Sequence, residues 1–310
     1  MTLSWWARLF VSLVVLATLL AAVQFPDLAS AAARVSPGLW ATALLVFLTG
    51  HVVSAFKWRL LILHDRPIAP GLWLRAHFAG LAANLCLPGI AGGDVVRAAW
   101  IGHRLGNVER VTVAAVADRG IDCLALLTIA GVGAAISRTG SDVRSMALLS
   151  AGAVGGVAVV ASFAGAAWLR RAHGEGLRAR LGTAVRGLLA APFRLAVALV
   201  LSLAVQMVFV MVNYQFGRAA GIDTTVVAWM VAWPLAKLVS LVPVSLAGLG
   251  VREAALVAFM RPFGAPAAAV AATGLLWQSV LFAGGLMGWA AGASGLTTLR
   301  RGVSQDAVET

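Results

Sequence analysis

Apolar residues in this chain fall into long blocks, and most of its charges lie in the short segments between them. A helix needs about 20 consecutive, mostly apolar residues to cross the hydrocarbon core of a bilayer, with a range of about 17–25. The pattern therefore predicts an all-α polytopic membrane protein with about six full spans. The predicted spans are residues 9–25, 39–56, 113–136, 146–169, 195–216 and 267–292.

Two further apolar regions, residues 78–102 and 225–260, are interrupted near the middle by proline and glycine. Proline removes a backbone donor and glycine weakens a helix, so the chain should leave helical geometry there. Irregular backbone persists at membrane depth only where it is buried in protein or lines a wet cavity. We therefore expect two re-entrant helical hairpins. The residues expected at their breaks are Pro88, Gly92, Gly93, Pro243, Gly248 and Gly250.

The two interrupted regions share a spacing that indicates an internal repeat. Pro88 and Arg97 in the first align with Pro243 and Arg252 in the second, at an offset of 155 residues. The same offset brings predicted spans of the first half onto predicted spans of the second. We therefore expect one membrane domain, residues 1–310, made of two half-repeats. The halves are residues 1–140 and 146–299, and residues 300–310 form a cytoplasmic tail.

The positions of lysine and arginine predict the orientation of the halves. If the N-terminus is cytoplasmic and each hairpin returns to its own side, 15 basic residues, Lys57 among them, face the cytoplasm and 5 face the other side. This asymmetry follows the positive-inside rule and puts both termini in the cytoplasm of a bacterial inner membrane protein. The hairpins then enter from opposite faces, an inverted arrangement found in many alternating-access transporters. As an alternative, the first apolar block is a cleaved signal peptide.

Composition excludes a soluble protein. Hydrophobic residues make up 61% of the 310 residues and charged residues 12%, whereas soluble domains contain about 45–50% apolar and about 25% charged residues. The net charge of +12 comes from basic residues that lie mostly between apolar blocks. Membrane topology explains that placement, so no nucleic acid is expected as a partner.

Eight ionisable residues nevertheless lie inside the apolar regions, and their charges sum to zero. A charge at the centre of a membrane helix costs about 2.5–3.5 kcal/mol even on the milder insertion scale, so these groups must pair or line a hydrated cavity. With Asn84 as a neutral neighbour, they are the candidate substrate-binding residues. The charged members are Asp94, Arg97, Asp118, Arg119, Asp122, Lys237, Arg252 and Glu253.

The positions of Arg97 and Arg252 favour an anion site. Each follows a break and so begins a short helix, whose first N–H groups lack intrahelical partners and carry partial positive charge. A guanidinium beside such a helix end suits a phosphate. Asp94, Glu253 and Asp118 would hold the arginines, or receive a cationic headgroup or a proton. The alternative is that all these groups are ion pairs that only hold the hairpins together.

Four motifs carry a resemblance to a known family. They are Asn84-Leu85-Cys86-Leu87-Pro88, Gly92-Gly93-Asp94-Val95-Val96-Arg97, Asp118-Arg119 and Pro243-Val244-Ser245-x-x-Gly248-Leu249-Gly250-Val251-Arg252-Glu253. In this order they resemble the lysylphosphatidylglycerol synthase transmembrane-region family, which includes the flippase part of the multiple peptide resistance factor. Similar proteins occur in hopanoid biosynthesis clusters and in archaeal dolichol-linked glycosylation. The resemblance implies that a lipid with a polar head moves between leaflets.

The leading hypothesis is therefore a transporter that moves a phosphate-headed lipid, either a phospholipid or an isoprenoid-linked lipid, by alternating access. We expect no catalytic residue, cofactor or metal. Only 18 residues follow the last predicted span, so the resemblance stops short of a soluble aminoacyl-transferase domain and lipid aminoacylation is not expected.

Two other functions stay open. The first is a polytopic membrane enzyme of lipid or lipid-linked glycan synthesis. Asp118-x-x-x-Asp122 resembles the second half of the metal-binding pattern of CDP-alcohol phosphotransferases, but the residues upstream do not match the first half. The second is an accessory scaffold for a lipid-modifying enzyme, in which the basic segment 170–194 would bind anionic lipid heads or the partner enzyme.

Overall fold

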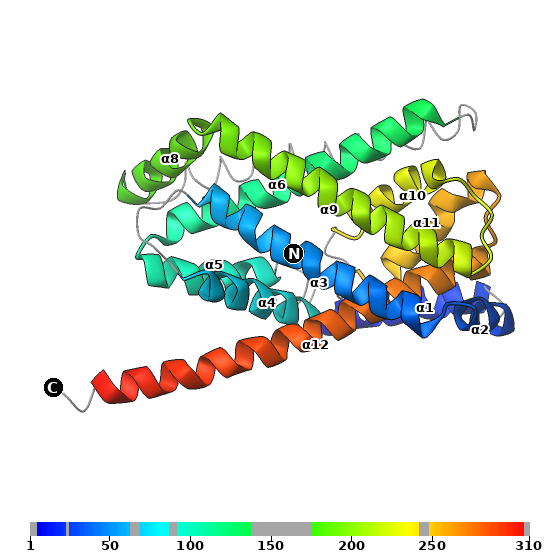
Figure 1. Ribbon diagram of the computed structural model, residues 1–310, viewed down its shortest axis with the longest axis horizontal. Coiled ribbons are helices and arrows are strands. Elements are labelled where there is room, and N and C mark those ends of the chain that lie inside the picture. Colours follow the sequence, from blue (N-terminus) through cyan, green and yellow to red (C-terminus); the bar gives the residue numbers. More distant parts are fainter. Residues whose placement is uncertain are drawn as a thin grey trace.

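The computed structural model describes residues 5–22, 25–62, 69–86, 92–137, 175–241 and 248–306. These residues form a bundle of helices, and no strand occurs among them (Figure 1). The predicted all-α class is therefore confirmed. The helices are α1 Trp5–Ala22, α2 Phe25–Ala33, α3 Pro37–Leu61, α4 Pro70–Cys86, α5 Gly92–Leu105, α6 Val108–Ile136, α8 Glu175–Leu189, α9 Pro192–Ala219, α10 Val226–Val239, α11 Val251–Met260, the 3₁₀ turn η1 Arg261–Phe263, and α12 Ala267–Asp306.

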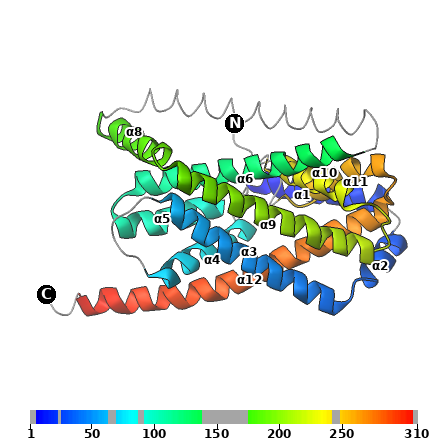
Figure 2. The same cartoon turned by 45° about the horizontal axis from the view of Figure 1, so that its top comes forward.

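Four helices of the described segments, α3, α6, α9 and α12, are long and apolar enough to cross a membrane. They correspond to four of the predicted spans. At about 1.5 Å per residue, the 25 residues of α3 extend roughly 37 Å, which exceeds a hydrocarbon core of about 30 Å. Figures 1 and 2 show these helices running along the bundle and crossing one another near its middle.

The structure does not support six spans. The predicted first span, residues 9–25, lies almost entirely in α1, and the axis of α2 is bent by 93° from that of α1 at the break between the two helices. Pro26 stands in the first turn of α2, where its missing N–H is tolerated, and proline disfavours helical geometry in the residue before it. Within the described residues the number of spans is four, or five if this bent pair forms one span.

Two other predicted segments are the span 146–169 and the tail from residue 300. The predicted span 146–169 lies outside the described residues. The predicted tail from residue 300 continues α12 as helix to Asp306.

Two pairs of short helices occupy the regions that the sequence marks as interrupted. Helices α5, α10 and α11 have 14, 14 and 10 residues and are shorter than a full span, and α4 with 17 residues stands at the lower limit. The predicted breaks at Pro88 and Pro243 lie outside the described residues. Figures 1 and 2 place the two pairs towards opposite ends of the bundle.

A close backbone contact holds α4 against α5. A Cβ atom added at Gly93 would lie 2.0 Å from the carbonyl oxygen of Gly80, and one added at Gly80 would lie 2.6 Å from the carbonyl oxygen of Gly93. Only glycine permits this approach. The Gly93 N–H also donates to Oδ1 of Asn84 at 2.8 Å, which satisfies one of the free donors at the start of α5.

Two glycines in left-handed geometry lead into α11. Gly248 has φ +77° and Gly250 has φ +80°, a region that side chains with a Cβ rarely adopt. The Gly250 N–H donates to Oε2 of Glu253 at 2.8 Å, so the start of α11 is also capped by the protein itself. A Cβ at Gly250 would lie 3.0 Å from the Leu16 nitrogen, because α1 crosses the bundle at this point.

Each short pair packs against a long helix from the other half of the chain. Helix α4 packs on α12, and α10 packs on α6. Glycines make these contacts close. A Cβ at Gly288 of α12 would lie 2.6 Å from the Phe78 carbonyl oxygen of α4, and one at Gly133 of α6 would lie 2.9 Å from Cβ of Met230 on α10. The remaining close pairs include α5 with α6, α11 with α12, and α3 with α9.

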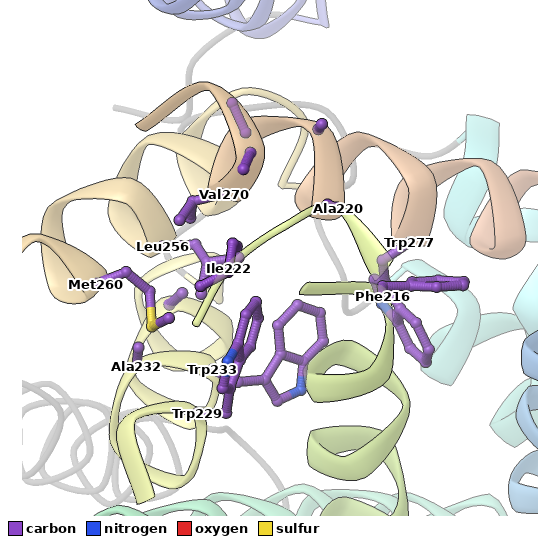
Figure 3. Close-up of a cluster of buried hydrophobic side chains, with 14 of the residues drawn as sticks. Phe216, Ala220, Ile222, Trp229, Ala232, Trp233, Leu256, Met260, Val270 and Trp277 are labelled. Carbon is purple, nitrogen blue, oxygen red and sulfur yellow. The ribbon is translucent and has the colours of Figure 1, made fainter. Parts of the chain in front are cut away.

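The largest hydrophobic core joins α9, α10, α11 and α12 (Figure 3). Trp229 and Trp233 of α10 lie at its centre and are 0% and 1% exposed. Trp277 of α12 meets Trp233 edge to face, with ring centroids 5.3 Å apart. This core fixes α10 relative to α12, and Trp233 and Trp277 also line the central cavity described below.

The Gly80–Gly93 contact yields a first prediction. Replacement of Gly93 by alanine should push α5 away from α4, and overpacking of this kind costs about 1–3 kcal/mol or more. Gly93→Ala should therefore lower the thermal unfolding temperature of the purified protein in detergent. Gly131→Ala is the matched control, because nothing lies within 4 Å of its added Cβ and alanine favours a helix. Equal unfolding temperatures for the two variants would contradict the close contact.

Candidate functional site

A cavity of about 170 Å³ lies between the two short pairs and the long helices. Its wall combines charged and amide side chains with aromatic rings, among them Phe47, Phe209, Trp233 and Trp277. The polar and charged residues that line it are His51, Ser54, His77, Asn84, Arg97, Asp118, Arg119, Asp122, Gln206, Lys237, Ser240, Arg252 and Gln278.

The structure gathers the candidate residues at this one place. Asp94 and Glu253 do not line the cavity, and each is paired with an arginine that does. The other seven candidates form part of its wall: Asn84, Arg97, Asp118, Arg119, Asp122, Lys237 and Arg252. Asn84 does so while capping α5.

Asp118 of α6 is the centre of the first charged cluster. Its Oδ2 accepts a hydrogen bond from Nη2 of Arg97 at 2.7 Å, and its Oδ1 lies 3.0 Å from Nζ of Lys57. All three side chains are nearly inaccessible, at 2%, 3% and 2% exposed. One carboxylate therefore connects α3, α5 and α6.

Arg97 has several further contacts. Its Nη2 lies 2.9 Å from Oδ1 of Asp94, and its Nη1 lies 3.2 Å from Nδ1 of His77. Its guanidinium carbon stands 4.6 Å from the ring centroid of Trp58, a cation–π distance. Two carboxylates thus already neutralise Arg97, which the sequence had suggested as a phosphate contact.

The remaining charges of the first half pair in the same region. Lys57 Nζ lies 2.5 Å from Oδ1 of Asp122, and both groups bond to the hydroxyl of Ser202 on α9 at 2.7 Å. Arg119 pairs with Asp94 through its Nε and through its Nη2, the latter at 2.9 Å. Three cations and three carboxylates therefore form one connected network.

The second half contributes a smaller cluster. Arg252 Nη2 donates to Oε1 of Glu253 at 2.5 Å and to Oε1 of Gln278 at 2.7 Å. Glu253 is completely buried. Lys237 Nζ donates to Oε1 of Gln206 at 2.8 Å and lies 5.4 Å from the ring centroid of Phe209.

Four buried donors on cavity-lining side chains have no acceptor among the described residues. They are Nε of Arg97, Nε of Arg252, Nε1 of Trp233 and Nε2 of Gln278. A buried donor without a partner costs about 1–3 kcal/mol, more for a charged group. The site therefore has spare donors and favours a ligand rich in acceptor oxygens.

Sequence reasoning missed Lys57 and His77. Lys57 is counted there as a cytoplasmic loop charge, whereas the structure buries it in α3 between Asp118 and Asp122. A polar stripe in the sequence could have indicated that Lys57 faces the protein interior, since His51, Ser54 and Lys57 recur at intervals of three along one helix. With Lys57 included, the buried charges number nine and no longer cancel.

No group of three His, Cys, Asp or Glu side chains suited to a metal ion occurs in the described part of the chain. Asp118 and Asp122, the pair that resembles half of a phosphotransferase pattern, both face the ammonium of Lys57. Their oxygens serve an internal cation.

The Asp118 contacts yield a second prediction. Asp118→Asn leaves Lys57 and Arg97 short of one buried negative charge, and loss of one partner from a buried pair costs about 3–5 kcal/mol. We expect a large drop in the unfolding temperature in detergent. Asp223→Asn is the matched control, because Asp223 pairs with Arg218 while its side chain is 99% exposed, and such surface pairs contribute about 0–1 kcal/mol. A drop as small as that of the control would contradict the central role of Asp118.

The family model described as the lysylphosphatidylglycerol synthase TM region matches residues 5–288. Among curated proteins, no match is found. The four membrane-spanning helices and the family model together show an integral membrane protein related to lipid metabolism. The chain therefore belongs to the lysylphosphatidylglycerol synthase transmembrane-region family, as its motifs predict.

Proposed function

We propose that this protein moves a lipid with a phosphate-bearing headgroup between the leaflets of a bacterial inner membrane. The observation that carries the proposal is the gathering of six charged side chains around one cavity, with three more paired behind them. Charges are rare within membrane-spanning segments and generally serve a substrate or ion pathway. A polar cavity lowers the barrier that a headgroup meets in hydrocarbon.

The size of the cavity suits a headgroup and not a whole lipid. A cavity of about 170 Å³ has room for several water molecules or a small polar group. The acyl chains would therefore remain in the bilayer while the polar group passes between the helices. The spare donors of Arg252 and Gln278 would bond to phosphate oxygens.

We further propose that the two halves form an inverted repeat. The helix bounds support this, because Pro37 and Pro192 begin α3 and α9, and Leu105 and Met260 end α5 and α11, each at the offset of 155. The packing supports it too, because the α4–α12 contact has a counterpart in α10–α6, and α5–α6 in α11–α12. The placement of the short pairs towards opposite ends of the bundle fits hairpins that enter from opposite faces (Figure 1).

Such a repeat gives a mechanism of alternating access. Rocking of one half against the other would open the cavity to each leaflet in turn. In the first half, Arg97 and Arg119 are held by carboxylates, so their role is to position α5 against α6. Among the cations of the cavity wall, Lys237 of the second half has no carboxylate partner in the described residues, so we assign it the direct contact with the headgroup charge. Both termini would lie in the cytoplasm, as the basic residues indicate.

The cavity route yields a third prediction. Val205 of α9 lines the cavity, so Val205→Trp should fill it. In vesicles that contain purified protein and a trace of fluorescent phosphatidylglycerol, reduction by external dithionite measures exchange between leaflets. We expect wild-type protein to speed exchange and Val205→Trp to slow it at least tenfold, about 1.4 kcal/mol in the barrier.

Val200→Trp is the matched control, because Val200 lies on the same helix and is 63% exposed on its outer face. It should exchange lipid at the wild-type rate. Absence of exchange by the wild type would contradict the proposed function. Equal rates for the two tryptophan variants would contradict the cavity as the route.

A further inference from the structure

Resting on the proposed function, we infer that Lys237 is the counter-ion for one negative charge on the headgroup. The lipid carried is then one whose headgroup has a single net negative charge on a phosphodiester. The inference rests on the balance of charges around the cavity and on donors that lack acceptors.

The charged side chains that the first half contributes to the site cancel one another. Its three cations and three carboxylates are all engaged with one another, as the contacts of Asp118, Asp122 and Asp94 show. Nothing in that network is left over for a ligand charge.

The charged side chains that the second half contributes to the site have a net charge of +1. Arg252 is neutralised by Glu253. Lys237 has no carboxylate partner among the described residues, and its ammonium bonds only to the neutral amide oxygen of Gln206. The sequences at the two predicted breaks, 87–91 and 242–247, contain no ionisable residue that would supply one.

The two histidines do not alter this balance. Arg97 has only donors, so Nδ1 of His77, 3.2 Å away, must accept and carries no proton. Nε2 of His77 then carries the proton and donates to Nδ1 of His51 at 3.1 Å. Both rings are therefore neutral, and the charged side chains of the site that the structure describes sum to +1.

The surroundings of this extra charge fit a phosphodiester. Lys237, Arg252 and Gln278 line the same cavity, and Nε of Arg252 and Nε2 of Gln278 have no acceptor among the described residues. Two non-bridging oxygens that share one negative charge would accept from these donors and neutralise Lys237. A zwitterionic headgroup would bring its own cation into a site that is already positive.

Binding of short-chain lipids in detergent tests this inference without any transport step. Trp233 and Trp277 line the cavity, so their fluorescence reports binding. We expect the wild type to bind dihexanoylphosphatidylglycerol at least tenfold more tightly than dihexanoylphosphatidylcholine. Lys237→Met should abolish the preference and Lys237→Arg should keep it. Arg218→Gln is the matched control, because it removes a charge from an exposed pair with Asp223 and should leave the preference unchanged.

The binding measurements can overturn the role of Lys237 in two ways. Equal binding of the two lipids by the wild type would overturn the inference, and so would a preference that survives in Lys237→Met. If Lys237→Met does not fold, the wild-type preference and its retention in Lys237→Arg remain as tests. Glycerophosphoglycerol and inorganic phosphate should bind far more weakly than the lipid, and equal binding would mean that the ligand is a free phosphate compound.

The outcomes also separate this inference from the proposed function. Exchange of both lipids at equal rates in vesicles, with equal binding, would keep the transporter and reject the role of Lys237. A Lys237-dependent preference without exchange would keep the binding site and reject transport.

Discussion

The low dielectric of a membrane interior requires every buried charge in this protein to find a partner, and Asp118 meets that requirement for two cations. Its carboxylate contacts Lys57 of α3 and Arg97 of α5 from its own place on α6. Because a charge left alone there is strongly unfavourable, these helices keep a fixed register. Together with the Asp94–Arg119 pair and the Gly80–Gly93 contact, the Asp118 carboxylate fixes the position of α5 and with it one side of the cavity.

Close glycine contacts complement the ion pairs. Hydrophobic burial gives little drive for helix association in lipid, so packing depends on backbones that approach closely. Gly80 with Gly93, Gly133 with Met230, and Gly288 with Phe78 provide such approaches at the short helices. The helices that carry the charges are therefore held together by van der Waals contact as well as by ion pairs. Lys237 is then not needed for an ion pair between helices.

The two halves of the cavity differ in what they offer. The first half is closed on itself, with three cations and three carboxylates in mutual contact. The second half differs in that its Lys237 is bonded only to the amide oxygen of Gln206 and has no carboxylate partner among the described residues. The paired charges of the first half would hold the helices in place. The lysine of the second half would then be available to bind a headgroup.

The sequence by itself determined the helical class, four of the spans and the candidate charges, because hydropathy and the cost of a buried charge are local properties of a segment. It could not place Lys57, which stands near the end of an apolar block and resembles a loop charge until α3 is extended to Leu61. Nor could it show the bend between α1 and α2 or the pairing of Arg97 with Asp118. The burial of Lys57, the bend and the ion pair depend on the tertiary structure, because residues distant in sequence come into contact only when the helices pack.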